Sequence, residues 1–193
     1  MTQVETGPFA SWTKPAWDEM FMGIAYITAM MSPDHNTKHG AVIVDCHKRV
    51  VSVGFNGYPP GCRDAEMPKI RPAKYLATEH AECNALNNAL CDVEGMTLYV
   101  TGHCCAPCFR TIRCRRISTV IYDPTIDTAC VTEDHIEMIK LMNQKPNYLS
   151  EDCGKPYLSN HIELVPFIGN FATCMDRAKE YYRIKQELKA KNS

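Results

Sequence analysis

Two short motifs, each at the start of a segment with helical character, constrain this chain more than any other feature of its sequence. The first runs from His80 to Glu82, and the residues after it place Ala and Leu side chains on one side of a helix. The second runs from Cys105 to Cys108 and opens another helical segment, whose first turn tolerates its proline. An apolar run at residues 96–100 lies between them and predicts a buried strand. We therefore expect the motifs at the beginnings of two helices that a strand separates.

The side chains of the two motifs have the chemistry of a catalytic metal site. One histidine and two thiolates are three zinc ligands, and zinc with three protein ligands keeps its fourth position for water, whereas structural sites usually close with four. A helix N-terminus also lowers the pKa of a thiol, which favours the metal-binding thiolate. Glu82 is the candidate for moving protons during attack by a zinc-activated water. Residues two apart do not share a helix face, so His80 and Glu82 converge only if the first turn faces a pocket.

Taken separately, each motif has an ordinary explanation. A lone C-x-x-C is typical of a redox pair, and a histidine before an apolar helix is typically a cap or a surface residue. Together, H-x-E followed by a strand and then by C-x-x-C at a helix start is typical of zinc-dependent deaminases. The combination therefore favours a zinc site over two unrelated motifs.

Composition narrows the class of partner. A chain of 193 residues, 45% of them hydrophobic, is sufficient for one compact domain. Its 21 Lys and Arg residues against 22 Asp and Glu residues argue against polynucleotide binding, but a few local cations still suffice for a small anionic substrate. No segment predicts export or a membrane span, and 11 cysteines, an odd number, favour reduced thiols over a disulfide framework. We expect a cytoplasmic protein with no membrane or polynucleotide partner.

The order of predicted elements indicates an α/β fold. An amphipathic helix precedes two β-branched strands joined by a polar turn, and helices then alternate with strands. We therefore expect a three-layer α-β-α sandwich around a mixed sheet of about five strands. Residues 56–74, rich in Gly, Pro and charge, are too long for a simple connection, and such loops are often functional. The expected helices are 17–31, 80–90, 105–113, 132–141 and 172–190, the expected strands are 40–44, 50–55, 96–100, 117–122 and 162–165, and a polar insert spans 143–160.

Segments between about Phe21 and Tyr122 resemble, in order, those of the deoxycytidylate deaminase family of the cytidine deaminase superfamily. They are GAVIV at 40–44, GFNGYPPGC at 54–62, HAECNA at 80–85 and CAPC at 105–108. The resemblance implies a cytidine deaminase-like sandwich, hydrolytic deamination of dCMP to dUMP and ammonia, activation by dCTP and inhibition by dTTP with Mg²⁺, and a hexamer. We expect a single deaminase domain over residues 1–193, with a regulatory-nucleotide loop near 54–79 and a C-terminal helical extension at 172–193.

By this resemblance His80, Cys105 and Cys108 are the zinc ligands, and Glu82 is the proton carrier. The family usually has proline directly before its first metal cysteine, but this chain has Cys104 there and its proline inside the motif. A pairing of Cys104 with Cys108 therefore stays open, although the C-x-x-C spacing favours Cys105. Residues 63–79 contain no Cys or His, so we expect one zinc per chain.

The resemblance also suggests nucleotide-binding residues. Asn56 is expected at the sugar of dCMP, because its amide offers both a donor and an acceptor. Lys38 and Tyr122 are candidates for the phosphate side. Gly57, Tyr58, Gly61 and Cys62 are expected at the effector site, and four cations flank the same loop, namely Arg63, Lys69, Arg71 and Lys74.

Two other functions stay open. A deaminase of cytidine, dCTP or tRNA adenosine shares the zinc motifs, although cytidine and tRNA adenosine deaminases do not need the long loop, and the near-neutral charge argues against tRNA. A non-catalytic, zinc-stabilised oligomerisation module would keep the thiol ligands, but it would not need Glu82 beside the metal.

Overall fold

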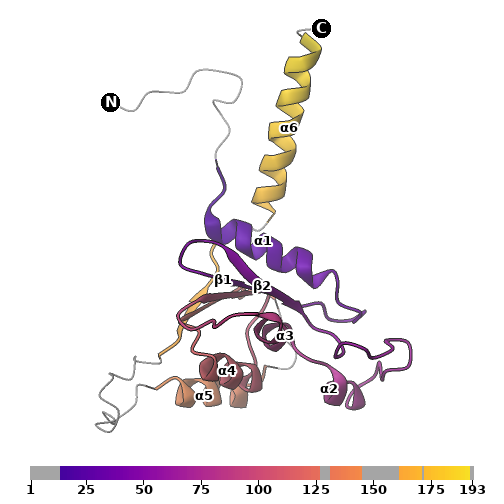
Figure 1. Cartoon of the computed structure of the whole chain (residues 1–193), viewed down its shortest axis with the longest axis vertical. Coiled ribbons are helices and arrows are strands. Elements are labelled where there is room, and N and C mark those ends of the chain that lie inside the picture. The colour runs from indigo at the N-terminus through magenta and orange to yellow at the C-terminus, as the bar shows by residue number, and fades with distance from the viewer. Residues whose placement is uncertain (1–13, 127–130, 145–160, 171, 192–193) are drawn as a thin grey trace.

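The computed structural model describes residues 14–126, 131–144, 161–170 and 172–191, and its central feature is one sheet (Figure 1). The strands are β1 Gly40–Val44, β2 Val50–Phe55, β3 Thr97–Val100, β4 Thr119–Tyr122 and β5 Glu163–Pro166. They lie in the order β2-β1-β3-β4-β5. β1 is antiparallel to β2 and β3, whereas β3, β4 and β5 are parallel. The prediction of a mixed sheet is confirmed.

Helices cover both faces of the sheet, with one on the first face and three on the second (Figure 1). On the first face, Phe21 and Met22 of α1 are fully buried and pack in one cluster with Tyr99 of β3. On the second face, Phe109 and its neighbours bury the inner sides of the other helices against the sheet. The three-layer α-β-α sandwich is therefore confirmed. These helices are α1 Trp17–Ala29, α3 Ala81–Asn88, α4 Ala106–Cys114 and α5 Glu133–Met142.

β1 is buried along its whole length because both of its faces are covered. Successive side chains of a strand point to opposite faces, so Val42 packs in the α1 cluster and Ile43 in the cluster with α3. The adjoining helices approach the sheet so closely that glycine is needed at two contacts. A Cβ atom on Gly40 would lie 2.0 Å from the carbonyl oxygen of Ala25, and one on Gly54 would lie 2.2 Å from the backbone nitrogen of Ala85. Gly40 therefore lets α1, and Gly54 lets α3, pack directly against the backbone of the sheet.

The largest difference from the predicted elements lies between β2 and α3. The sequence predicts a loop over residues 56–74, but a short helix, α2 Ala73–Ala77, begins before that range ends. Five residues are too few to carry an amphipathic pattern, and the helix is held by a tertiary contact, an ion pair between the buried side chains of Lys74 and Asp34. The predicted helices at 17–31 and 80–90 end at Ala29 and Asn88. Beyond Gln144, the polar insert predicted to end at residue 160 lies outside the described residues.

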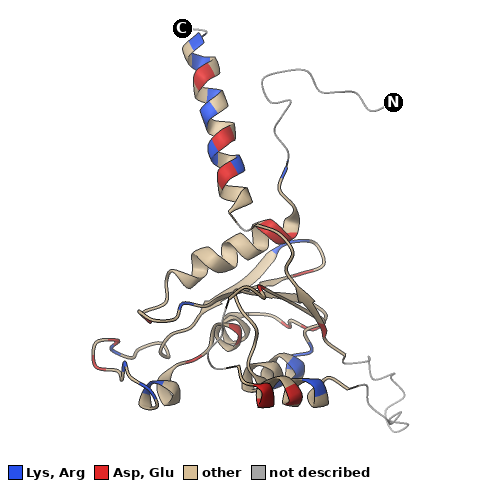
Figure 2. Ribbon diagram, turned by 180° about the vertical axis from the view of Figure 1, so that it is seen from behind, with Lys and Arg blue, Asp and Glu red and all other residues tan. Residues whose placement is uncertain are grey.

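The last described element is α6 Thr173–Lys191, which corresponds to the helix predicted at 172–190. It extends away from the sheet on the side of α1 (Figure 1), and basic and acidic residues are interspersed along it (Figure 2). None of its residues is buried, and the guanidinium of Arg183 donates to the carboxylate of Glu187 at 2.9 Å. Local pairs of this kind support the helix where the sheet contributes little.

None of the helices in the described part of the chain is long and apolar enough to cross a membrane.

Candidate functional site

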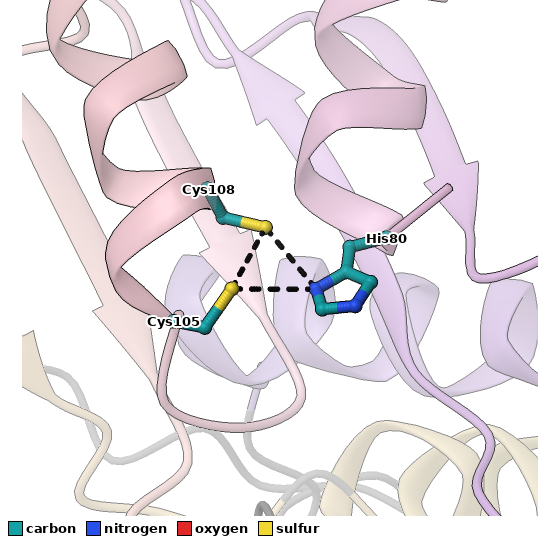
Figure 3. Close-up of side chains that lie close together, drawn as sticks. All are labelled: His80, Cys105 and Cys108. Atoms are coloured by element: carbon teal, nitrogen blue, oxygen red, sulfur yellow. Dashed lines mark hydrogen bonds between the residues drawn. The ribbon is translucent and has the colours of Figure 1, made fainter. Parts of the chain in front are cut away.

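Three donor atoms from two helix beginnings converge at one point (Figure 3). The Nδ1 atom of His80 lies 3.4 Å from the Sγ atom of Cys105 and 3.3 Å from that of Cys108, and the two sulfur atoms are 3.4 Å apart. His80 is the N-cap residue of α3 and Cys105 is that of α4, both with extended backbone. The extended caps turn the two side chains towards each other across the gap between the helices (Figure 3). Cys104 is buried but lies outside this group.

The geometry and chemistry of this group fit zinc. Usual zinc bond lengths and tetrahedral angles separate two sulfur atoms by about 3.8 Å, and a sulfur and a nitrogen atom by about 3.6 Å. The observed separations of 3.3 to 3.4 Å differ from these values by only a few tenths of an ångström. In the described part of the chain, three residues form the group. A zinc ion held there would keep a position for water.

Hydrogen bonds among the three side chains shift their pKa values. Hydrogen bonds from Cys108 and then from His80 lower the pKa of the Cys105 thiol to about 4. The hydrogen bond to Cys105 raises the pKa of His80 to about 9, and hydrogen bonds with Cys105 and Cys83, together with burial, raise the pKa of Cys108. A metal cation would replace these protons, because zinc binds thiolates and the neutral imidazole.

Glu82 lies in the first turn of α3, two residues after His80, and its side chain is buried. Burial raises its pKa to about 7, against the opposing effect of the nearby His80. A carboxyl group with a pKa near neutrality both accepts and donates protons readily at that pH. Both His80 and Glu82 border the same cavity. The first turn of α3 therefore faces a pocket, which is the condition under which the two residues converge.

A second part of the cavity wall comes from α2 and the residues just before it. Arg71, Lys74, Tyr75 and Thr78 border the cavity at helical spacing. Lys74 is paired with Asp34, which also borders the cavity. Burial opposes ionisation of Asp34, but the hydrogen bond from Lys74 and those from two backbone N–H groups lower its pKa. The guanidinium of Arg71 lies 4.9 Å from the centre of the Tyr75 ring, and both side chains are exposed.

A family comparison decides what this architecture belongs to. Residues 15–123, more than half of the chain, match the family described as the cytidine and deoxycytidylate deaminase zinc-binding region. The chain belongs to this family. Its zinc-binding region contains the His80, Cys105 and Cys108 group.

Individual relatives agree with this assignment. The chain is 38% identical over 113 residues to the deoxycytidylate deaminase of Homo sapiens, a match that covers 55% of this chain and 64% of that protein. It is 36% identical over 126 residues to the deoxycytidylate deaminase of Mycobacterium phage D29, covering 57% of this chain and 96% of that one. The chain thus spans less than two thirds of the human relative.

A solved structure extends the likeness to the fold. The crystal structure of dCMP deaminase from the cyanophage S-TIM5, in complex with dCMP and dUMP, matches with a TM-score of 0.58 at 21% identity. The match covers 80% of this chain and 99% of that one. At this identity the likeness concerns the fold alone, and it confirms the cytidine deaminase-like sandwich.

Asn56, Lys38 and Tyr122 were predicted to bind the substrate nucleotide. Of these three, Asn56 borders the cavity. The side-chain amide of Asn56 accepts a hydrogen bond from the backbone N–H of His39 at 2.7 Å and donates to the carbonyl of Thr37 at 2.9 Å. Lys38 donates to the carbonyl of Ser32, and Tyr122 packs edge-on against His103 with 4.8 Å between ring centres. Neither Lys38 nor Tyr122 is among the described residues that border the cavity. Their assignment to the phosphate side stays a prediction.

The predicted effector loop is fastened next to the metal-binding group. Gly57 exchanges two backbone hydrogen bonds with Glu79, at 3.0 and 2.8 Å, directly before His80. The hydroxyl of Tyr58 donates to the carbonyl of Pro68 at 3.0 Å. Gly61 has a φ of 88°, a left-handed conformation that suits glycine, and Cys62 is exposed. Within the described chain, these four residues lie outside the cavity wall, and their effector role stays a prediction.

Sequence reasoning did not single out several residues of the cavity, and Arg71 and His39 are two of them. Arg71 is one of four cations near the loop, and nothing in the sequence separates it from the other three. His39 precedes β1 and carries no motif. Both border the cavity only because the segments around residues 34–39 and 71–78 fold beside α3. The ion pair of Lys74 with Asp34 brings these two segments together. Two residues so far apart in the chain cannot be recognised as partners from one sequence.

Proposed function

We propose that the protein catalyses the zinc-dependent hydrolytic deamination of dCMP to dUMP and ammonia. The observation that carries this proposal is the buried Glu82 bordering the same cavity as His80 and Cys105 of the metal-binding group. Membership of the cytidine and deoxycytidylate deaminase family supports it. So do the curated relatives named deoxycytidylate deaminase.

In the proposed reaction, His80, Cys105 and Cys108 hold one zinc ion, with Cys105 rather than Cys104 as the first cysteine ligand. When bound, zinc supplies a water whose pKa is lowered towards neutrality. Glu82 takes a proton from this water as the water oxygen bonds to C4 of the cytosine ring, and gives the proton to N3. It then takes the proton of the new C4 hydroxyl and delivers it to the amine, which leaves as ammonia when the C4–N4 bond breaks and the C4 carbonyl forms. The pKa of about 7 that burial gives to Glu82 suits a group that must act as base and acid in turn.

The part of the cavity wall formed by Arg71, Lys74, Tyr75 and Thr78, called the α2 wall, supports a nucleotide rather than a nucleoside as substrate. The charge of Lys74 is already matched by Asp34, whereas Arg71 has no ion pair with a carboxylate among the described contacts. A guanidinium is well suited to a phosphate group, because its N–H donors form a planar fork. We assign Arg71 to the phosphate of dCMP. Asn56 is proposed for the sugar, with its remaining acceptor capacity.

Regulation and assembly are also proposals. Activation by dCTP and inhibition by dTTP, with Mg²⁺, are assigned to the loop containing residues 57–62. The paired backbone of Gly57 and Glu79 supports this, because a ligand that moves the loop would also move the residue before His80. We further propose one domain with a C-terminal helical extension, assembled as a hexamer.

The deciding experiment is ultraviolet-monitored deamination of dCMP, cytidine, dCTP and adenosine, each with and without added dCTP or dTTP. Preference for dCMP with opposite responses to the two triphosphates is expected. Turnover of cytidine, dCTP or adenosine in place of dCMP would reassign the substrate. A protein that contains a zinc ion with a fourth protein ligand and deaminates none of the four compounds would be an oligomerisation module instead.

A further inference from the structure

His39 carries a buried donor for which the described chain provides no partner. Its side chain borders the cavity together with Asn56, His80 and Glu82. The Nε2 atom is fully buried and makes no hydrogen bond. Buried polar atoms are nearly always paired in folded proteins, so an unpaired one that borders a cavity indicates a ligand or an ordered water.

The contacts of the other ring nitrogen fix what Nε2 offers. Nδ1 of His39 lies 3.3 Å from the hydroxyl oxygen of Thr101, and that oxygen accepts the backbone N–H of Gly40 at 3.1 Å. The Thr101 hydroxyl is buried, so its own proton needs a hydrogen-bond acceptor. Among the described contacts, Nδ1 of His39 is the acceptor available to it. Nδ1 then accepts, so the proton of the neutral ring is on Nε2. His39 therefore presents an N–H donor to the cavity.

The surroundings of this donor favour an uncharged ligand atom. His39 is held in place by its backbone bond to Asn56, and the cation assigned to the phosphate, Arg71, is an exposed residue. The carboxyl group of Glu82 borders the same cavity, and it disfavours an anion beside it. An uncharged oxygen accepts from a neutral N–H without such repulsion.

We propose that His39 is a substrate-binding residue that donates from Nε2 to an uncharged oxygen of the nucleotide, either the carbonyl of the pyrimidine ring or a hydroxyl of the sugar. This inference rests on the proposed deamination of a cytosine nucleotide. It gives His39 a share in recognising the nucleoside part, separate from the reaction at Glu82 and from the phosphate contact at Arg71.

The test replaces the ring by one of similar size without a donor, His39→Phe. The kcat/KM for dCMP should fall about 10- to 100-fold, because a buried hydrogen bond to substrate is lost. Zinc content should stay at the wild-type level. The melting temperature of the substrate-free protein should change little, because the variant removes the unpaired buried donor but also removes the acceptor of the buried Thr101 hydroxyl. His39→Gln, whose amide still donates, should recover part of the lost kcat/KM.

A matched control and a second substrate separate the outcomes. His35→Phe makes the same change at an exposed position of the same segment and should leave all three measurements unchanged. With 2′,3′-dideoxycytidine monophosphate, the loss caused by His39→Phe should disappear if the sugar 3′-hydroxyl is the acceptor and persist if the ring carbonyl is.

Three results would overturn the inference. They are an unchanged kcat/KM in His39→Phe, a loss that merely follows a lower melting temperature or zinc content, and a wild-type protein without turnover of dCMP. The last result would also remove the proposed function, whereas the first two leave it intact because wild-type turnover is measured independently.

Discussion

The two walls of the cavity are built in different ways. The metal wall rests on the first turns of α3 and α4, two helices whose inner sides are fully buried against the sheet. The α2 wall rests on a five-residue helix tied to the rest of the protein by the Lys74–Asp34 pair. The comparison indicates that the part of the site assigned to the reaction is supported by the core. The part assigned to substrate choice lies outside the core, and polar contacts hold it, namely the Lys74–Asp34 pair and the backbone bonds between Gly57 and Glu79.

The largest effect is expected from the metal wall, in Cys105→Ser. Serine is a poor zinc ligand, so bound zinc should fall from about one per chain to near zero, and deamination should fall with it. Metal analysis of the purified protein measures this directly. Cys104→Ser is the matched control and should keep its zinc. The reverse pattern would move the ligand to Cys104.

Glu82→Gln should separate zinc binding from proton transfer within the same wall. We expect kcat to fall by about 10²- to 10⁴-fold, because an amide does not move protons as a carboxyl group does. Zinc content should not change. Glu137→Gln, on the exposed side of α5, is the control for the substitution. Near-normal turnover in Glu82→Gln would assign the proton carrier elsewhere.

Arg71→Ala should change substrate choice and leave the chemical step intact. Loss of a charge-assisted contact to phosphate should raise KM for dCMP by about 10- to 100-fold, with little change in kcat. The kcat/KM for deoxycytidine, which has no phosphate, should stay the same. Arg63→Ala removes a cation that is paired with Glu66 at the surface and should have no effect. An equal fall in kcat/KM for dCMP and deoxycytidine would show that Arg71 does not bind the phosphate.

The smallest effect is expected from Asp34→Asn, measured as stability. The pKa of Asp34 is lowered in the folded protein, so its carboxylate contributes stability above its ordinary pKa, and this contribution is lost as the pH falls below about 4. At pH 7 we expect the variant to lose about 1 to 3 kcal/mol of unfolding free energy, because Lys74 is left without its partner. Denaturant titrations at pH 7 and at about pH 3 should show this difference shrinking in acid.

Glu66→Gln serves as the control for that experiment, because both members of the Arg63–Glu66 pair are largely exposed and exposed pairs contribute little. If Asp34→Asn is as stable as the wild type at pH 7, the α2 wall is held by packing and not by its ion pair.

Local signals predicted most of the fold. Apolar periodicity located α1, α3 and α4 to within one or two residues at most ends, and the two motifs fell at helix caps, where backbone geometry turns side chains outwards. The same signals failed at α2, because one turn of helix has no periodicity and its anchor, Asp34, lies far away in the sequence. The family resemblance suggested Lys38 and Tyr122 for the phosphate side of the nucleotide. This stays a prediction, and the described contacts of these side chains are to Ser32 and His103.

The sequence by itself determined the donors His80 and Cys108, the candidate proton carrier Glu82 and the layered fold, because each depends on short motifs or local patterns in the chain. Only the tertiary structure decided that Cys105 rather than Cys104 meets His80 and Cys108, and that His39, Arg71 and Glu82 share one cavity. The physical reason is that a cavity wall is made by segments separated by many residues. These segments come together because α1 and α3 pack closely on the sheet at Gly40 and Gly54.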